Sequence, residues 1–231
     1  MKTLYLSDLH LGSPMFKSED KILSLLNNNY DQIFLVGDII DTWEEPKEDT
    51  IRKYPLLIDR LNEMESLFIV QGNHDPSVEE LKEIFPNADI TDSCAIFYTE
   101  GQPTAITHGH EFDNLIVKHY WLAKLLFPIH WVLERLGIDI RNCCNKLYHS
   151  VARKIQNKCY HDLVLNIEQD AVEEYKNFRY IVMGHTHLPK LVASDNNIYI
   201  NCGDWIDNKT YVECIDGEFR LMGRYTTKKE P

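Results

Sequence analysis

The chain has 231 residues and a mass of 27.1 kDa, a length that suits one large globular domain with its own core. Hydrophobic residues make up 44% of it and charged residues 26%, which excludes a disordered or low-complexity protein. The formal net charge is −12 at pH 7 and the sequence pI is about 5.2. This balance argues against a nucleic-acid-binding protein, whose surface needs a basic stripe.

The six cysteines show neither a CxxC pair nor the spacing of a small secreted domain, so we expect reduced thiols. Only residues 3–6 precede the first polar pair, which is too few for a signal peptide. No stretch offers the roughly 20 apolar residues that a membrane-spanning helix needs. We therefore expect a cytoplasmic protein that at most contacts a membrane surface.

The first 110 residues alternate short apolar runs with amphipathic segments, a pattern that favours a layered α/β domain. Ser77 and Glu80 form a capping box, which predicts a helix that ends near Phe85. Two β-like runs between residues 94 and 107 flank Gly101 and predict a hairpin. The other predicted elements are strands over Thr3–Leu6, Gln32–Val36 and Ser66–Val70 and helices over Ser18–Asn29 and Ile51–Met64.

Residues 113–178 break this pattern, because they contain one glycine, one proline and many long side chains, so we predict several helices there. We interpret the chain as a single domain over residues 1–231 with a helical cap insertion at about 113–178. After the insertion we predict short strands over Tyr180–Met183, Lys190–Ala193, Ile198–Asn201, Tyr211–Cys214 and Glu218–Arg224.

Five polar clusters follow apolar runs and contain six of the ten histidines: Asp8-Leu9-His10, Gly37-Asp38 with Asp41, Gly72-Asn73-His74-Asp75, His108-Gly109-His110 and Gly184-His185-Thr186-His187. Open α/β sheets build their sites at the carboxyl ends of strands. A single histidine is more often a structural hydrogen-bonding group, but this gathering with Asp and Asn predicts a metal site. The absence of thiolates favours Mn²⁺, Fe or Zn²⁺. Seven plausible ligands exceed the needs of one ion, so we predict two divalent ions that share a carboxylate.

Other catalytic motifs, including GxxxxGK, GxGxxG, GxSxG and HExxH, are absent from the sequence. Residues 203–207 repeat the GDxxD spacing of residues 37–41, a repetition that we interpret as coincidental. We assign the metal-binding role to residues 37–41, which lie between the first and third clusters behind a predicted strand. Asp75 is expected to hold a local turn rather than to act in catalysis.

The ordered series DxH, GDxxD, GNHD, HGH and GHTH, from Asp8 to His187, resembles the calcineurin-like metallophosphoesterase superfamily. The resemblance implies two packed mixed β-sheets flanked by helices, and a hydroxide that bridges two metal ions, usually Mn²⁺, and attacks phosphorus. It also implies that His74 is a catalytic histidine that faces the substrate and that Asp41 orients it. The implied ligands are Asp8, His10, Asp38 and His187 for one ion, and Asp38, Asn73, His108 and His185 for the other.

The stretch from residue 113 to residue 161 contains eight basic and three acidic residues, so its local charge is +5 and the remainder carries −17. Aromatic residues are mixed with these basic side chains, above all within residues 120–136. One interpretation is a helical subdomain that packs its apolar face on the core. The other is a cap over the metal site with an apolar groove and a face suited to an anionic lipid surface.

The segment His108-Gly109-His110-Glu111-Phe112-Asp113, a long aromatic insertion, GHTHxP and Tyr199-Ile200-Asn201-Cys202-Gly203-Asp204-Trp205 are together similar to the UDP-2,3-diacylglucosamine diphosphatase group. That group cleaves a nucleotide-linked lipid pyrophosphate in lipid A synthesis. The resemblance implies a cap that receives acyl chains, phosphate contacts from Lys154 and Lys158, and a peripheral position at the inner membrane. The alternatives are a soluble phosphoesterase acting on a nucleotide, a cyclic nucleotide or a phosphoprotein, and an inactive metal-binding scaffold, against which the His74–Asp41 pair speaks.

Overall fold

The computed structural model of the chain describes residues 1–113 and 164–223. Two compact units are present, one formed by residues 1–109 and 175–231 and the other by residues 110–174. The described part of the second unit contains a 3-10 turn at His110–Phe112 and a helix over residues 164–174. Most of the predicted cap insertion, with Lys154 and Lys158, lies outside the described residues, so that cap remains a prediction. No helix within the two described ranges has the length and apolar character needed to cross a membrane.

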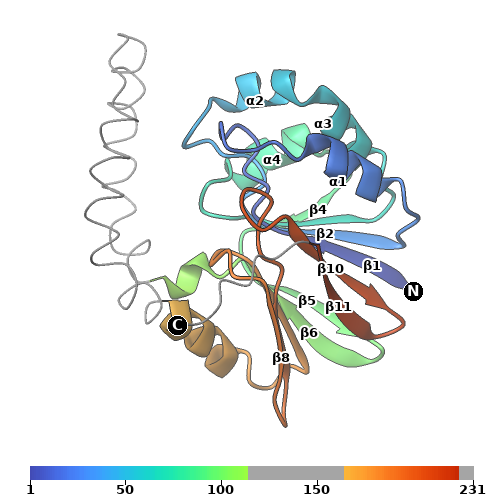
Figure 1. Ribbon diagram of the computed structural model, residues 1–231, viewed down its shortest axis with the longest axis vertical. Coiled ribbons are helices and arrows are strands. Elements are labelled where there is room, and N and C mark those ends of the chain that lie inside the picture. The colour runs from blue at the N-terminus through green and yellow to red at the C-terminus, as the bar shows by residue number, and fades with distance from the viewer. Residues whose placement is uncertain (114–163, 224–231) are drawn as a thin grey trace. The chain divides into compact units, whose positions relative to one another are not determined.

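The first unit contains two mixed β-sheets, which confirms the predicted fold class (Figure 1). The six-stranded sheet has the order β11-β10-β1-β2-β3-β4, and its strands β1 to β4 are parallel. The five-stranded sheet has the order β5-β6-β7-β9-β8, with β6, β7 and β9 parallel. The strand bounds are β1 (Lys2–Leu6), β2 (Gln32–Val36), β3 (Leu67–Val70), β4 (Asp89–Thr91), β5 (Ala95–Thr99), β6 (Gln102–Ile106), β7 (Tyr180–Met183), β8 (Lys190–Ala193), β9 (Ile198–Asn201), β10 (Thr210–Ile215) and β11 (Glu218–Gly223).

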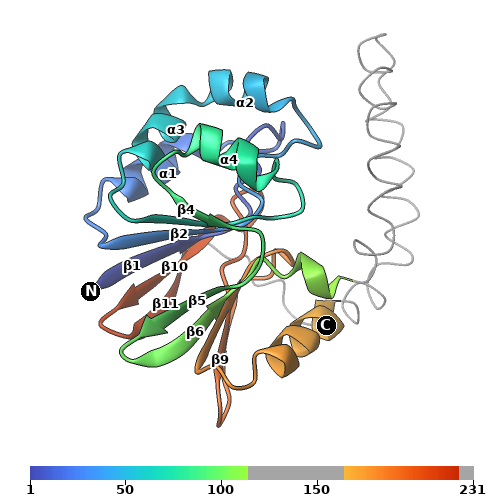
Figure 2. The same ribbon diagram turned by 180° about the vertical axis from the view of Figure 1, so that it is seen from behind.

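Four helices cover the outer face of the six-stranded sheet (Figures 1 and 2). They are α1 (Glu19–Leu26), α2 (Lys47–Lys53), α3 (Pro55–Asn62) and α4 (Val78–Ile84). Side chains along a strand alternate between the two faces of a sheet. Leu4 and Leu6 accordingly join the core beneath the helices, whereas Tyr5 joins the core between the two sheets.

Aromatic rings fill the space between the two sheets. The ring of Phe34 on β2 stacks on Tyr5 and on Phe68, with centroid distances of 5.1 and 4.7 Å. Phe97, on β5 of the other sheet, meets Phe34 edge to face at 4.7 Å. Such pairs add specific geometry to apolar burial, so the two sheets are held in one arrangement and their carboxyl ends can build a common site.

The structure corrects one predicted helix and adds one strand. The segment Ile51–Met64 is helical as predicted but is divided into two helices, because α2 ends at Lys53 and α3 begins at Pro55. Proline disfavours helical geometry in the residue before it, and Tyr54 has φ −122° and ψ 47°. The capping box at the start of α4 is confirmed in both of its hydrogen bonds. The three-residue edge strand β4 was not predicted.

Candidate metal centre

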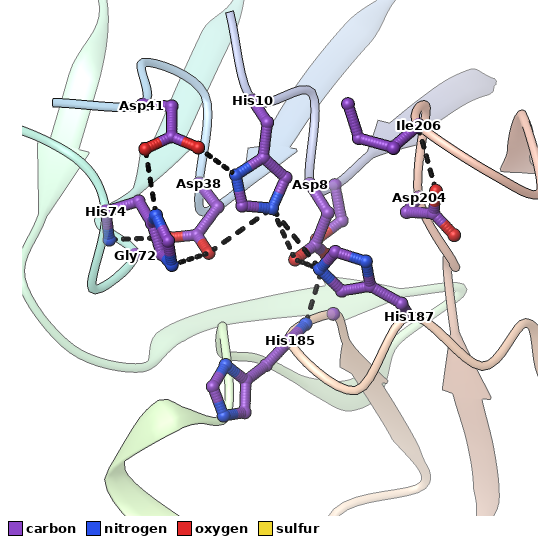
Figure 3. A network of polar contacts seen from close by, with 12 residues as sticks. Asp8, His10, Asp38, Asp41, Gly72, His74, His185, His187, Asp204 and Ile206 are labelled. Carbon is purple, nitrogen blue, oxygen red and sulfur yellow. Dashed lines mark hydrogen bonds and ion pairs between the residues drawn. The ribbon is translucent and has the colours of Figure 1, made fainter. Parts of the chain in front are cut away.

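Residues from each of the five polar clusters come together where β1, β2, β3, β6 and β7 end, and Figure 3 shows those from four of the clusters. Backbone hydrogen bonds tie the loops to one another as they leave the sheets. Asp8 N donates to Gly37 O at 3.0 Å, and His10 N donates to Asp38 O at 2.9 Å. In the other sheet, Gly184 N donates to the carbonyl of His108 at 3.2 Å. The side chains that follow the strands therefore start from fixed backbone positions.

The first cluster consists of Asp8, His10 and His187, which each offer a ligand atom within 4.8 Å of the others. His187 Nε2 lies 3.0 Å from Asp8 Oδ1 and 3.2 Å from His10 Nε2. His10 Nδ1 donates to the Asp41 carboxylate at 2.9 Å, which leaves its Nε2 facing the cluster. A carboxylate behind a ligating histidine is a common way to set the tautomer of the ring.

The second cluster consists of Asp38, His108 and His185. His108 Nδ1 donates to the carbonyl of Val36 at 2.9 Å, and its Nε2 lies 3.4 Å from Asp38 Oδ2. The same Asp38 oxygen lies 3.7 Å from Nε2 of His10, in the first cluster. One carboxylate oxygen thus lies between two groups of ligand atoms, as a shared ligand of two ions would.

Asn73 supports the fit of a cation to this centre. It is 6% exposed, and its Oδ1 accepts no hydrogen bond from the described residues. Burying an amide oxygen without a donor is costly, and a cation would supply the missing interaction. The donor set of carboxylate, imidazole and amide oxygen suits a divalent ion.

Asp41 connects His74 to the first cluster (Figure 3). Its carboxylate accepts from His74 Nδ1 at 2.9 Å on one oxygen and from His10 on the other. The indole ring of Trp43 stacks on the imidazole of His74, with centroids 4.1 Å apart. His74 Nε2 lies 4.0 Å from Asp38 Oδ2, so this nitrogen faces the centre while the other nitrogen is held from behind.

The carboxylates of the site are ionised because histidines surround them. Burial alone would raise the pKa of Asp8, but His187 and His108 outweigh it and lower this pKa to about 2. Burial likewise opposes a low pKa at Asp38, yet His108 and His74 hold it well below the usual range. The pKa of His187 is lowered by burial but raised more by Asp8, to about 9. The carboxylates are therefore ionised at neutral pH, and a metal ion that binds His187 would displace the proton of this ring.

Five residues of the centre have a left-handed backbone: Asp8, His10, Asp38, His185 and His187, with φ between 49° and 62°. This conformation costs about 1–3 kcal/mol for a residue with a side chain and persists only where its surroundings enforce it. Strain of this kind gathers at functional sites.

Asp75 holds a turn, as expected from the sequence. Its two buried oxygens accept hydrogen bonds from the backbone N–H groups of Ile39, Ile40 and Gly72 at 2.7–2.8 Å. These bonds connect the loop after β2 with the loop after β3. Gly72 itself permits the close approach, because a Cβ there would overlap the backbone nitrogen and the carboxylate of Asp38.

Three contributors to the centre were not identified from the sequence. Ser7 donates its hydroxyl to Val36 O at 2.7 Å and also to the Asp8 carboxylate. Trp43 stacks on His74. The loop of residues 203–210 donates the N–H of Trp205 to Asp8 O at 3.1 Å. The repeated GDxxD spacing was the available signal for that loop, whereas neither Ser7 nor Trp43 belongs to a recognisable pattern.

Comparison with known families and sequences gives one consistent result. The family model for calcineurin-like phosphoesterases matches residues 1–189. UDP-2,3-diacylglucosamine hydrolase of Vibrio atlanticus (strain LGP32) is 24% identical over 243 residues, which cover 97% of this chain and 98% of that protein. The enzyme of the same name from Nitrosococcus oceani is 23% identical and covers 96% of this chain and 94% of its own.

Solved structures show the same fold. An archaeal phosphodiesterase superimposes with a TM-score of 0.52 at 16% identity, covering 96% of this chain and 99% of its own. Yfce, a phosphoesterase from E. coli, superimposes with a TM-score of 0.51 at 17% identity, covering 97% of this chain and all of its own.

Proposed function

The chain belongs to the calcineurin-like phosphoesterase family and is a hydrolase of phosphate esters or anhydrides; from this premise we propose that it uses two divalent ions to cleave the pyrophosphate of UDP-2,3-diacylglucosamine or a similar nucleotide-linked lipid. Asp38 carries the proposal, because one of its oxygens lies between ligand atoms of the first and second clusters, 3.7 Å from His10 Nε2 and 3.4 Å from His108 Nε2.

In the proposed site, the first cluster and Asp38 hold one ion, and the second cluster and Asn73 hold the other. Asp38 is the shared ligand. Mn²⁺ suits this set of carboxylate, imidazole and amide donors, with Fe and Zn²⁺ as alternatives. Two bound ions supply Lewis-acid activation of water and of the phosphate group.

His74 and Asp41 supply the proton chemistry of the proposed reaction. Asp41 accepts from His74 Nδ1, so the ring keeps its orientation while Nε2 faces the substrate. Burial lowers the pKa of His74, but Asp38 and Asp41 outweigh it and, without bound ions, raise this pKa to about 8. When Asp38 binds the ions, Asp41 is the carboxylate that favours the protonated ring. A protonated ring can hydrogen-bond the charge that develops on the phosphate or donate the Nε2 proton to the leaving oxygen.

The lipid part of the proposal has two supports. Relatives that align along almost the whole chain are UDP-2,3-diacylglucosamine hydrolases. The stretch of residues 113–161 is basic and aromatic in an otherwise acidic chain, as expected for contact with anionic lipid. We extend the proposal to phosphate contacts by Lys154 and Lys158 and to a cytoplasmic enzyme that is peripheral to the inner membrane.

The test compares two substrates of purified enzyme loaded with Mn²⁺. UMP should be released from UDP-2,3-diacylglucosamine far faster than from UDP-N-acetylglucosamine, which has the same pyrophosphate without the two long acyl chains. Equal rates would overturn the lipid assignment and leave a soluble phosphoesterase acting on nucleotides, cyclic nucleotides or phosphoproteins. Failure to turn over these substrates and bis-p-nitrophenyl phosphate would overturn the proposed catalysis.

A further inference from the structure

The loop of residues 203–210 has no part in the proposed chemistry, although it begins with the second GDxxD sequence of the chain. Asp204 in this loop is fully buried. Within the described ranges it belongs to none of the groups that could hold a metal. A buried carboxylate near a metal centre that binds no metal must have its charge satisfied in another way.

Among the described residues, the carboxylate of Asp204 accepts hydrogen bonds from its own loop. Its Oδ1 accepts from the backbone N–H groups of Ile206 and Asp207 at 2.8 and 2.5 Å, as Figure 3 shows for Ile206. Its Oδ2 accepts from the side-chain amide of Asn208 at 2.6 Å. The carboxylate therefore closes the loop and fixes the orientation of the Asn208 amide.

The Asn208 amide then reaches the first cluster. Its Nδ2 also donates to the backbone carbonyl of His187 at 2.8 Å. In the same loop, Trp205 N donates to the backbone carbonyl of Asp8 at 3.1 Å. These two bonds hold the backbones of two first-cluster residues whose φ angles are 56° and 52°.

The loop is itself anchored to the sheet and to the segment before α1. Thr210 N donates to Asp204 O at 3.1 Å, and the Thr210 hydroxyl donates to Cys202 O at 2.8 Å. On the other side, the Ser18 hydroxyl donates to Trp205 O at 3.1 Å. A loop held at both ends can keep the strained backbone of the first cluster in place.

We propose that Asp204 and Asn208 are positioning residues that fix the backbone of His187 and thereby set the affinity of the first cluster for its ion. This role rests on the proposed function, because it requires that the first cluster bind a metal. Loss of a residue that hydrogen-bonds to a metal ligand without binding the metal itself typically lowers metal affinity by about 10- to 100-fold. Asp204 orients Asn208, and Asn208 holds the carbonyl beside the ligand.

The experiment separates this role from simple loop stability by exchanging the two side chains. Asn208→Asp removes the donor to the His187 carbonyl and places two carboxylates together. The double variant D204N/N208D restores a hydrogen bond between the side chains, because Asn at position 204 can donate to Asp at position 208. It does not restore the bond to His187, because an ionised Asp has no N–H group.

Mn²⁺ binding is measured by titration calorimetry, and the melting temperature is measured without metal. His187→Ala and His185→Ala identify the binding event of each cluster. We expect N208D to lower the melting temperature and to weaken the first event about 10-fold or more. The double variant should regain the melting temperature and keep the weak first event. Thr99→Val, which removes a buried hydroxyl pair in β5 and β6, should lower the melting temperature alone.

Recovery of metal affinity together with the melting temperature would show a structural role and overturn the proposal. Unchanged affinity in N208D would do the same. If N208D does not fold, Asn208→Ala removes both donors without adding charge and takes its place in the titration. A wild-type protein whose first cluster binds no ion overturns the proposed function as well, so the two failures can be told apart.

Discussion

The first and second clusters use similar side chains but are held in place differently. All three residues of the first cluster have a left-handed backbone. The loop of residues 203–210 donates hydrogen bonds to two of their carbonyls. In the second cluster Asp38 and His185 share that backbone conformation, whereas His108 does not. His108 is instead fixed through its ring, which is fully buried and donates to Val36 O.

The comparison shows that a metal-ligating residue can be oriented through its backbone or through its side chain. The first cluster depends on strained backbone and on residues 203–210, so changes far along the chain should reach it. The second cluster depends on burial and on the turn held by Asp75. Perturbations of the two supports should therefore weaken different ions.

The largest effect is expected where the two clusters meet. Asp38→Ala should abolish both Mn²⁺ binding events and reduce turnover by several orders of magnitude, because its carboxylate is the proposed ligand of both ions. Metal content after gel filtration and hydrolysis rate check this expectation. Asp20→Ala, at an exposed position of α1, is the control, and retention of one full binding event would contradict the shared ligand.

His74 belongs to neither cluster, so its loss should affect rate without affecting metal. His74→Gln keeps a polar side chain but cannot donate a proton as an acid, and kcat should fall by roughly 10²- to 10⁴-fold. Both binding events should keep the wild-type affinity in titration calorimetry. A variant that turns over at the wild-type rate would remove His74 from the mechanism, and one that loses an ion would make it a ligand.

The support of the second cluster can be broken alone. In Asp75→Asn, an amide N–H replaces one of the oxygens that accept from Ile39, Ile40 and Gly72. The second binding event should weaken by about 10- to 100-fold, and the free energy of unfolding should fall by about 1–3 kcal/mol. Titration calorimetry with Mn²⁺ on this variant and on Asn208→Ala compares the two supports. If both variants weakened the same event, the separation of the two supports would be wrong.

The smallest effect concerns the stability that each ion contributes. An ion present at 100 times its dissociation constant stabilises the fold by about 2.7 kcal/mol, or roughly 5–11 °C in melting temperature for a chain of this size. Chelation with EDTA should remove both contributions. His187→Ala and His185→Ala should each respond to chelation about half as strongly, as measured by thermal denaturation. An undiminished response in either variant would show that its histidine is no ligand.

The polar clusters could be found from the sequence because each follows a β-like apolar run. Asp8 and Asp38 follow neighbouring parallel strands of one sheet, so linear spacing was enough to predict that they lie together. His185 follows a strand of the other sheet, and its place beside them was implied by the family resemblance. The short strand β4 offered only three residues of pattern. The break at Pro55 was available in the sequence, since proline restricts the residue before it.

The supports of the site were harder to predict. Asn208 reaches His187 across 21 residues, and no periodicity reports such a contact. Trp43 and His74 lie in the loops after β2 and β3, and their stack depends on contacts between these two loops. Asp8 and His187 have left-handed φ angles because of contacts that form only in the folded chain. From sequence this backbone conformation is expected mainly at glycine, so these two positions were not predicted.

The left-handed residues of the centre also bear on how this protein would evolve. At each of these five positions, glycine would relieve the backbone while removing a ligand. Selection for the reaction and selection for a stable fold therefore act in opposite directions on the same residues. Homologues that no longer catalyse the reaction should acquire glycine at these positions first. Such a homologue would bind no metal and would have a more stable fold.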